Sequence, residues 1–362
     1  MTTGFSELRV LELGSAPSGQ YCGYLLAGLG AEVIKVQTRS HRTQAAGPGP
    51  DEAGLRDLYM DSAKKVVPLT PGDTSVVRRL LERADVVVDT REAADRGGPS
   101  EAEMADWNPR LVIARISWFG LSGPHADVRA TELTCAASSG YMFMNGYADR
   151  EPLKLFGVQG QRHAGLQSAI AVLAALRVRD QTGQGTTLDI SVQEALVYLT
   201  AGAPLDYFHT GSVRRRSGNS QAASTRGQTY TSILRCADGF ILLGLVGARD
   251  FARLEQLMNV SLAPSVSHTR EFPGAHEAEL NKICGSWLSS QRRADVLDRA
   301  MACGLHWALV NDMSDVAASD QVQERGFLIH ATVDGRDILM PGRPIVFGAI
   351  GWRTGWEAPT DT

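Results

Sequence analysis

Residues Gly160 to Leu196 read GQRHAGLQSAIAVLAALRVRDQTGQGTTLDISVQEAL, and this stretch decides the fold of the chain. Apolar residues cover most of the circumference between Arg162 and Arg179, which predicts a buried, central helix. Gly183 and Gly185 end that helix, because glycine readily takes the backbone conformation that stops a helix. Residues 187–192 then predict a strand. A buried helix followed by a tight turn and a strand is typical of an α/β protein.

The first half of the chain repeats this alternation of strands and helices. The predicted elements are a strand at 8–13, a turn at 14–19, a helix at 20–29, a strand at 31–36, a helix at 75–83 and strands at 85–89 and 111–119. Strands that alternate with helices form parallel sheets, because each helix carries the chain back to the same edge. We therefore predict a doubly wound, Rossmann-like parallel sheet in a large domain at residues 1–200.

The composition and the periodicity of the sequence change in the second half of the chain. The run after Tyr207 is polar, rich in Gly and Ser and without periodicity, so we expect a linker at 201–228. A smaller α+β domain is expected at 229–325, and residues 326–362 are expected to return to the large domain. The elements predicted for the smaller domain are strands at 229–235 and 239–246 and helices at 248–258, 276–288 and 294–302.

Composition excludes several classes of protein. A formal charge of -4 and a pI near 6.1 argue against a nucleic-acid partner. The five cysteines form no C-x-x-C pair, so neither a zinc site nor a disulfide framework is expected. Arg177 and Arg179 interrupt the longest apolar stretch, and the N-terminus lacks the pattern of a signal peptide. We expect a cytoplasmic protein that contacts no membrane and holds no metal.

The turn after the first strand invites a dinucleotide-binding interpretation, which its residues do not favour. Gly14, Gly19 and Gly23 do not have G-x-G-x-x-G spacing, and Gln37 stands where a ribose-binding acid is wanted. Backbone N–H groups at the helix start still suit an anion such as a phosphate, although a purely structural turn is equally compatible.

Two arginines follow the second predicted strand. Arg39 and Arg42 come after its carboxyl end, where open α/β sheets bind ligands. Their guanidinium groups suit a phosphorylated cofactor, and a solvated loop with surface arginines is the alternative.

The histidine and serine residues form no motif that identifies a reaction. His163 stands at the head of the central helix, where a histidine is more often a satisfied polar group than a catalyst. The chain contains neither H-x-x-x-H spacing nor a G-x-S-x-G nucleophile elbow. The residues alone therefore predict an α/β protein with an anion site at the sheet edge.

Several blocks of sequence, taken in order, resemble the family III CoA-transferases, which include carnitine CoA-transferase and α-methylacyl-CoA racemase. The blocks are VLELGSAPSGQYCGYLLAGLGAEVIKVQ at 10–37, NPRLV at 108–112, ISWFG at 116–120, Gly123-Pro124, LAALRVRDQTGQGTTLDISVQEAL at 173–196, Ser217-Gly218-Asn219, Ala237-Asp238-Gly239, Asp320-Gln321 and Arg325-Gly326. They cover nearly the whole chain in the family's order and spacing.

The resemblance implies an acyl-CoA protein in which a coenzyme A thioester is the substrate. It also implies two chains that interlock like links, as a homodimer or a heterodimer of homologues. The positions that match the family's CoA contacts are Ala16, Arg39, Leu69, Thr90 and Arg91, with Arg42 nearby. Thr90 and Arg91 replace the family's usual Asn-Phe pair.

The catalytic positions depart from the family pattern. Transferases of the family use an Asp four residues before a Gly at the start of the central helix, and counting back from Gly165 gives Gln161. An amide is a poor nucleophile and does not ionise at neutral pH. Racemases of the family add a His-Asp pair in the preceding loop, which here reads Thr131-Glu132, so their two-base proton transfer also lacks its usual members.

Three interpretations follow. In the first, the chain is an enzyme that transfers or rearranges a CoA thioester without the usual Asp, with Glu132 or His163 taking over, or acts by racemase-like proton transfer. In the second, it is a non-catalytic subunit that binds CoA or braces an active partner. In the third, the register is displaced and another carboxylate acts; the nearest are Asp149, Glu151 and Asp189. We favour the first.

Overall fold

The computed structural model describes residues 4–38, 52–69, 73–92, 98–218, 220–222, 229–263, 274–333, 336–348 and 351–355. The chain divides into two compact units. The first contains residues 1–142, 154–213 and 324–362, and the second contains residues 143–153 and 214–323. Arg39, Arg42 and Asn219, which the sequence singled out, lie outside the described residues.

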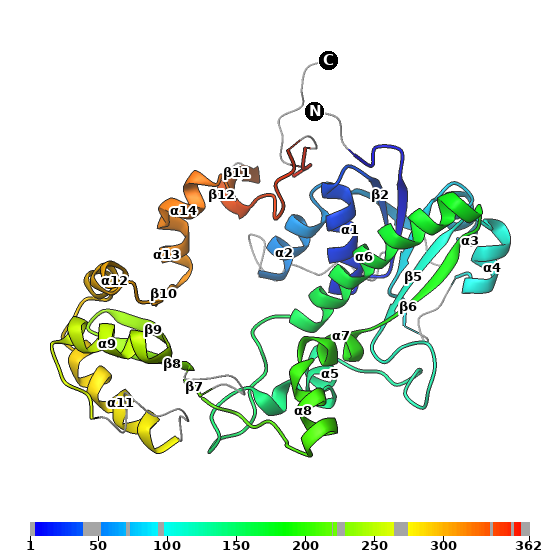
Figure 1. The fold of residues 1–362 in the computed structure, drawn as a ribbon. Coiled ribbons are helices and arrows are strands. Elements are labelled where there is room, and N and C mark those ends of the chain that lie inside the picture. Colours follow the sequence, from blue (N-terminus) through cyan, green and yellow to red (C-terminus); the bar gives the residue numbers. More distant parts are fainter. Residues whose placement is uncertain are drawn as a thin grey trace. The chain divides into compact units, whose positions relative to one another are not determined.

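A six-stranded parallel sheet forms the centre of the first unit (Figure 1). Its strands are β1 (Arg9–Leu13), β2 (Glu32–Thr38), β3 (Lys65–Leu69), β4 (Val86–Asp89), β5 (Val112–Ser117) and β6 (Thr186–Ser191). Their order is β3-β2-β1-β4-β5-β6, and every neighbouring pair is parallel. The strand order therefore reverses between β1 and β4, which is where doubly wound sheets bind ligands. The predicted α/β class and Rossmann-like sheet are confirmed.

Helices α1 to α6 lie between these strands in the chain, and two more helices follow the last strand. They are α1 (Pro17–Gly28), α2 (Glu52–Asp61), α3 (Thr74–Leu81), α4 (Glu101–Trp107), α5 (Glu132–Ser138), α6 (Gln159–Thr182), α7 (Val192–Leu199) and α8 (Gly202–Thr210). The hairpin of β11 (Leu328–Val333) and β12 (Arg336–Pro341) belongs to the same unit. Helix α8 occupies part of the segment expected to be a linker.

Helices α1 and α6 lie against each other beside the sheet (Figure 1). They approach closely because Gly165 of α6 faces the α1 backbone: a Cβ atom there would lie 2.4 Å from the carbonyl oxygen of Ser18. Helix α6 is buried along much of its length and ends at Gly183, whose φ of 78° is in the left-handed region. This matches the predicted central helix, except that it starts at Gln159 and runs to Thr182.

The second unit contains a four-stranded antiparallel sheet with the order β10-β9-β8-β7. Its strands are β7 (Ser220–Ala222), β8 (Thr229–Cys236), β9 (Gly239–Val246) and β10 (Ala308–Val310), and its helices are α9 (Gly247–Met258), α11 (Gly274–Leu288), α12 (Arg293–Ala302), α13 (Met313–Ala318) and α14 (Asp320–Glu324). A separate hydrophobic core, which includes Leu243, Phe251 and Cys284, holds this unit together.

Three properties of the described residues bear on the sequence expectations. All five cysteines are free thiols. The described part of the chain holds no group of three or more His, Cys, Asp or Glu side chains suited to a metal ion. Within the same residues, no helix is long and apolar enough to cross a membrane.

Candidate functional site

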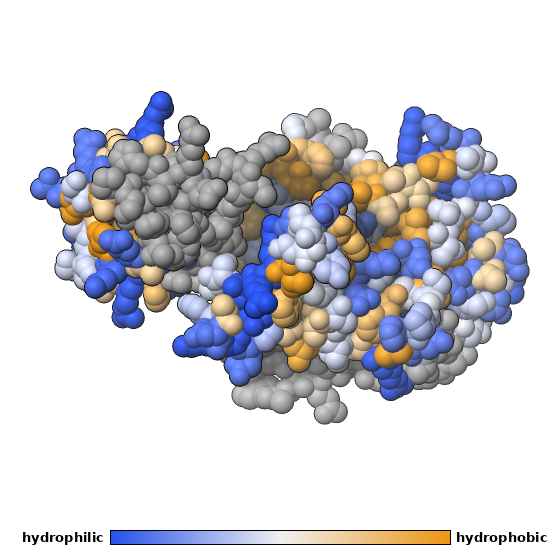
Figure 2. All heavy atoms as spheres, turned by 60° about the horizontal axis from the view of Figure 1, so that its bottom comes forward, coloured by the Kyte–Doolittle hydropathy of each residue, from blue (hydrophilic) through white to orange (hydrophobic). Residues whose placement is uncertain are grey.

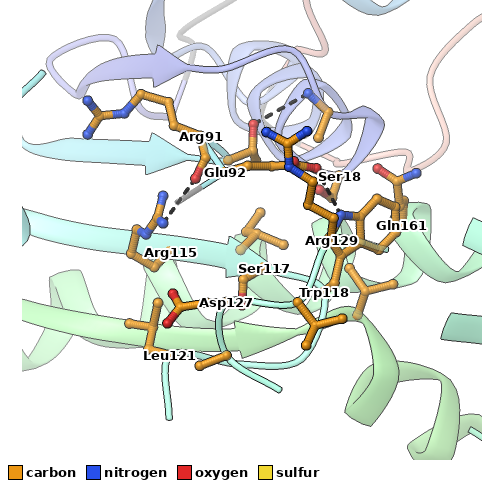
Figure 3. Close-up of a pocket in the computed structure, with 16 residues that line it drawn as sticks. Ser18, Arg91, Glu92, Arg115, Ser117, Trp118, Leu121, Asp127, Arg129 and Gln161 are labelled. Carbon is orange, nitrogen blue, oxygen red and sulfur yellow. Dashed lines mark hydrogen bonds between the residues drawn. The ribbon is translucent and has the colours of Figure 1, made fainter. Parts of the chain in front are cut away.

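A cavity of about 90 Å³ lies in the first unit, where the carboxyl ends of β1 and β4 meet. We call it the inner cavity. Its lining residues are Ala16, Ser18, Thr90, Arg91, Glu92, Arg115, Ile116, Ser117, Trp118, Leu121, Ala126, Asp127, Val128, Arg129, Gln161 and Val192. Figure 3 shows that they come from the sheet edge, from the loop between β5 and α5, and from the helices α1, α6 and α7. The cavity therefore occupies the position that the strand order predicts for a ligand.

The start of helix α1 forms one wall of the inner cavity. Ala16 precedes the helix, and its N–H donates a hydrogen bond to Oγ1 of Thr90 at 3.4 Å. Gly14, with a φ of 94°, lets the chain turn there, because a Cβ atom would lie 2.4 Å from the same oxygen. The first turn of α1 contains no acidic residue and its cap makes no side-chain hydrogen bond, so no side-chain charge of that turn offsets the positive end of the helix dipole, which suits an anion.

The guanidinium of Arg91 is already engaged by the protein. Its Nε and Nη2 donate to the two oxygens of Asp89 at 2.9 and 2.8 Å, and Nη2 also donates to the carbonyl of Pro99. Arg115, 1% exposed, lies 3.0 Å from the same carboxylate and 2.9 Å from that of Glu101. The charge and the hydrogen bonds of the Arg91 guanidinium are therefore largely taken up within the protein.

Gln161 and Glu132 come together at the start of helix α6. The Gln161 side chain is 6% exposed, lines the inner cavity and makes no hydrogen bond to the described residues. The carboxylate of Glu132 accepts from the backbone N–H of Gly160 at 2.7 Å and from that of Gln161 at 3.1 Å. Glu132 thus caps α6 and stabilises the positive end of its dipole.

His163 lies on a different face of α6. Successive helical residues turn by about 100°, so Gln161 and His163 point about 200° apart. His163 lines a second cavity, and its Nε2 lies 3.2 Å from Nε2 of Gln167. Burial lowers the pKa of His163, which favours the neutral imidazole. The structure therefore brings Glu132 to Gln161 but places His163 in a separate cavity.

Two carboxylates of the inner cavity were missed by the sequence reasoning. Glu92 accepts a hydrogen bond from Nε1 of Trp118 at 3.1 Å, whereas Asp127 has no hydrogen-bond or ion-pair partner among the described residues. Arg129, also missed, lines the same cavity from the loop between β5 and α5 (Figure 3). Their positions in the sequence could have indicated them, because Glu92 closely follows the end of β4, and the loop that carries Asp127 and Arg129 follows the end of β5.

The remaining predicted residues lie away from the inner cavity. Leu69 is the last residue of β3, which is an edge strand of the six-stranded sheet. Both carboxylate oxygens of Asp189 accept from the N–H of Leu121, at 3.1 and 3.0 Å. Asp149 and Glu151 are exposed and belong to the second unit.

Comparison with known proteins adds three findings. Residues 5–362 match the sequence model of CoA-transferase family III. The chain is 27% identical to the succinate–glutarate CoA-transferase of Agrobacterium fabrum, over 98% of this chain and 92% of that protein. It is also 27% identical to subunit BbsE of the succinyl-CoA:(R)-benzylsuccinate CoA-transferase of Thauera aromatica, over 99% of this chain and 92% of that one.

A solved structure supports the same grouping. The crystal structure of a CAIB/BAIF family protein from Brucella suis superposes with a TM-score of 0.87 and 25% sequence identity. The alignment covers 99% of this chain and 97% of the other, so both compact units have counterparts there.

Proposed function

Because this chain belongs to CoA-transferase family III, we propose that it transfers CoA from an acyl-CoA thioester to a second carboxylic acid without an acyl-enzyme intermediate. The observation that carries the proposal is Gln161: an unpartnered, buried amide lines the inner cavity at the position that matches the family's Asp. The relatives are named for succinate, glutarate and benzylsuccinate, so dicarboxylic acids are the substrates we propose.

We propose that only the thioester end of the CoA part enters the inner cavity, because a volume of about 90 Å³ is too small for the whole of CoA. Ala16, Thr90 and Arg91 line this cavity and match the family's CoA contacts. The start of α1 suits an anionic group, such as a phosphate or the thiolate of CoA. We keep Leu69, Arg39 and Arg42 as further proposed contacts, the last two from outside the described residues.

The proposed reaction needs no nucleophile from the protein. An oxygen of the acceptor carboxylate attacks the thioester carbonyl carbon, the C–S bond breaks, and a mixed anhydride and CoA thiolate form. The thiolate then attacks the acceptor's carbonyl carbon in the anhydride, and the donor acid leaves as a carboxylate. In this proposal the amide N–H of Gln161, which lines the inner cavity, donates to the oxygen on which negative charge develops, and this lowers the barrier.

Glu132 is a poorer candidate for covalent catalysis. Both of its oxygens accept backbone hydrogen bonds at the start of α6, and these bonds stabilise the negative charge that a nucleophile must give up. Glu132 is also absent from the residues that line the inner cavity. We therefore assign it the role of positioning Gln161.

The test compares the wild type with the Gln161→Asp variant, which restores a carboxylate. Each is incubated with succinyl-CoA, glutarate and hydroxylamine, and intact and peptide masses are recorded. We expect CoA transfer without an adduct in the wild type and a trapped hydroxamate at position 161 in the variant. A wild-type adduct at Glu92, Asp127 or Glu132 would falsify the direct route.

A non-catalytic subunit is the second proposal, since one relative is itself named as a subunit of a CoA-transferase. In that case the purified chain binds CoA but transfers none until a homologous partner with the usual Asp is added. Analytical ultracentrifugation of the chain, with and without such a partner, separates a homodimer from a heterodimer. Racemase-like proton transfer, the third possibility, is tested by exchange of the Cα hydrogen of a 2-methylacyl-CoA in D₂O.

A further inference from the structure

A second, larger cavity of about 880 Å³ lies in the first unit. We call it the outer cavity. Its lining residues are Tyr21, Tyr24, Arg56, Tyr59, Met60, Leu155, Phe156, Gln159, Arg162, His163, Leu166, Leu199, Phe327, Pro341, Gly342 and Pro344. Gln159, Arg162 and His163 belong to the first turns of α6, so this cavity borders the same helix start as the inner cavity but from another face.

The charge of the outer cavity is positive. Arg56 and Arg162 line it, and none of the described lining residues is Asp or Glu. Arg162 has no carboxylate within 4.0 Å in the described part of the chain. Burial and the neighbouring Tyr24 raise the pKa of Tyr59, and the positive charge of Arg162 opposes that rise. Arg56 has one long ion-pair contact, 3.6 Å to Asp57, so the two guanidinium groups together carry more positive charge than the nearby carboxylate balances, which favours an anionic ligand.

Arg56 carries the clearest sign of a missing partner. Its Nε is buried and has no hydrogen-bond acceptor among the described residues. Its Nη2 lies 3.6 Å from Oδ1 of Asp57, which is beyond a hydrogen bond, and that oxygen also accepts from Nε2 of Gln20 at 3.4 Å. Burying an unpaired polar atom costs free energy, so a ligand that accepts from Nε relieves a cost that the free protein bears.

Most of the other residues that line the outer cavity are apolar or aromatic. Tyr21 stacks on Tyr24 with ring centroids 6.3 Å apart, and the hydroxyls of Tyr24 and Tyr59 share a hydrogen bond of 2.8 Å. The side chains of Phe156 and Leu199 are 86% and 45% exposed. Exposed apolar residues are common on this protein, as the orange atoms among blue ones in Figure 2 show. In the outer cavity they lie together with the two arginines, which suits a hydrocarbon that bears an anionic group.

We propose that the outer cavity is the organic-acid subsite, in which Arg56 and Arg162 bind the non-reacting carboxylate of a dicarboxylic acid and the aromatic wall holds its hydrocarbon part, so that the reacting carboxylate extends past the start of α6 to the thioester. This inference rests on the proposed function, because it assigns the acid and the CoA thioester to neighbouring cavities on either side of the α6 start. It makes Arg56 and Arg162 specificity-determining residues. Acids with an apolar body and a carboxylate are the chemical class that fits.

Binding of benzylsuccinate to the full-length protein, followed by isothermal titration calorimetry, tests the subsite without any turnover. We expect Arg56→Gln and Arg162→Gln each to weaken binding by about tenfold or more, because each removes charge-assisted hydrogen bonds. Arg56→Lys, which keeps the charge but loses the fork of donors, should restore part of the affinity. Arg177→Gln is the matched control, since Arg177 is an exposed residue of α6 outside both cavities.

Titration of CoA with the same variants separates this inference from the proposed function. Unchanged CoA affinity with weakened acid binding supports a separate acid subsite. Equal acid affinity in the wild type and both Gln variants overturns the inference and leaves the proposed function standing. No binding of benzylsuccinate by the wild type, as expected if a second copy of the chain fills the cavity, also overturns it. If the wild type does not bind CoA, that result contradicts the proposed function and not this inference alone.

Discussion

At the scale of single residues, Glu132 connects the local structure of α6 to the inner cavity. Its carboxylate accepts from the first backbone N–H groups of that helix, so it fixes where Gln161 lies. Glu132→Ala should lower the free energy of unfolding by about 1–2 kcal/mol, because the helix loses its cap and a favourable charge at its positive end. Urea unfolding followed by circular dichroism measures the change.

Glu132→Gln separates capping from catalysis. An amide oxygen still accepts one backbone hydrogen bond, so this variant should retain more stability and most of the CoA affinity. Glu7→Ala, an exposed change in the same unit, is the control for a surface carboxylate. Full stability of Glu132→Ala, with a rate of transfer reduced to background in both variants, would contradict a capping role and make Glu132 a catalytic residue.

His163 gives the molecule a predictable response to pH. Burial lowers its pKa in the folded chain, so the unfolded chain binds the proton more readily. Stability from this group is therefore complete above its ordinary pKa of about 6.5 and is lost as the pH falls below that value. We expect the urea midpoint to fall between about pH 7.5 and about pH 5.5, and to fall less in His163→Gln. An equal fall in both proteins would show that other groups cause it.

The site was predictable in part, and the reason lies in its residues. Gln161 was found because helix, turn and strand fix the register of the stretch that carries it, and Glu132 because its loop precedes that helix. Arg129 and Asp127 were missed because the loop between β5 and α5 has no periodicity, and only the tertiary fold brings it over the sheet edge. The engagement of Arg91 by Asp89 is likewise invisible in sequence, since side-chain pairing depends on rotamers.

At the scale of elements, the contact between α1 and α6 depends on a single glycine. Gly165→Ala would place a Cβ atom 2.4 Å from the carbonyl oxygen of Ser18, and this backbone atom moves only if the helices separate. We expect the variant to lose about 1–3 kcal/mol of stability, as overpacked interiors do. The shift should also weaken CoA binding, because Ser18 and Gln161 of the same helices line the inner cavity.

Gly285→Ala is the matched control. Gly285 lies within α11, and a Cβ atom there would meet no atom within 4 Å. Alanine should stabilise that helix by about 0.5–1 kcal/mol, because it restricts the unfolded chain and favours the helix. Thermal unfolding of both variants gives the comparison, and a Gly165→Ala protein as stable as the wild type would show that α1 and α6 do not need this close approach.

The elements that were predicted are those with strong periodicity or clear turns. The hairpin of β8 and β9 and helices α6, α9 and α12 lie within a few residues of the expected bounds. Helix α1 begins at Pro17 rather than at Gln20, because proline suits the first helical position, where no N–H is needed. Strand β3 and helix α8 were not predicted: β3 has exposed residues at alternate and adjacent positions, and α8 buries none of its residues.

At the scale of the whole molecule, the two compact units have separate hydrophobic cores. Val88 in the core of the first unit and Leu243 in the core of the second are both fully buried, at 0% exposure. Units with separate cores unfold as separate cooperative units when the contacts inside each outweigh the coupling between them. Each unit should then have its own free energy of unfolding.

Hydrogen exchange followed by mass spectrometry tests this expectation. Leu243→Ala removes buried methyl groups and should destabilise the second unit by about 2–5 kcal/mol, whereas Val88→Ala should destabilise the first by a similar mechanism. Faster exchange confined to β8, β9 and α9 in the first variant, and to the parallel sheet in the second, is the expected result. Faster exchange of both sheets in either variant would mean that the chain unfolds as one cooperative unit. The binding of CoA should protect only the parallel sheet and α6, because the inner cavity is lined by the first unit alone.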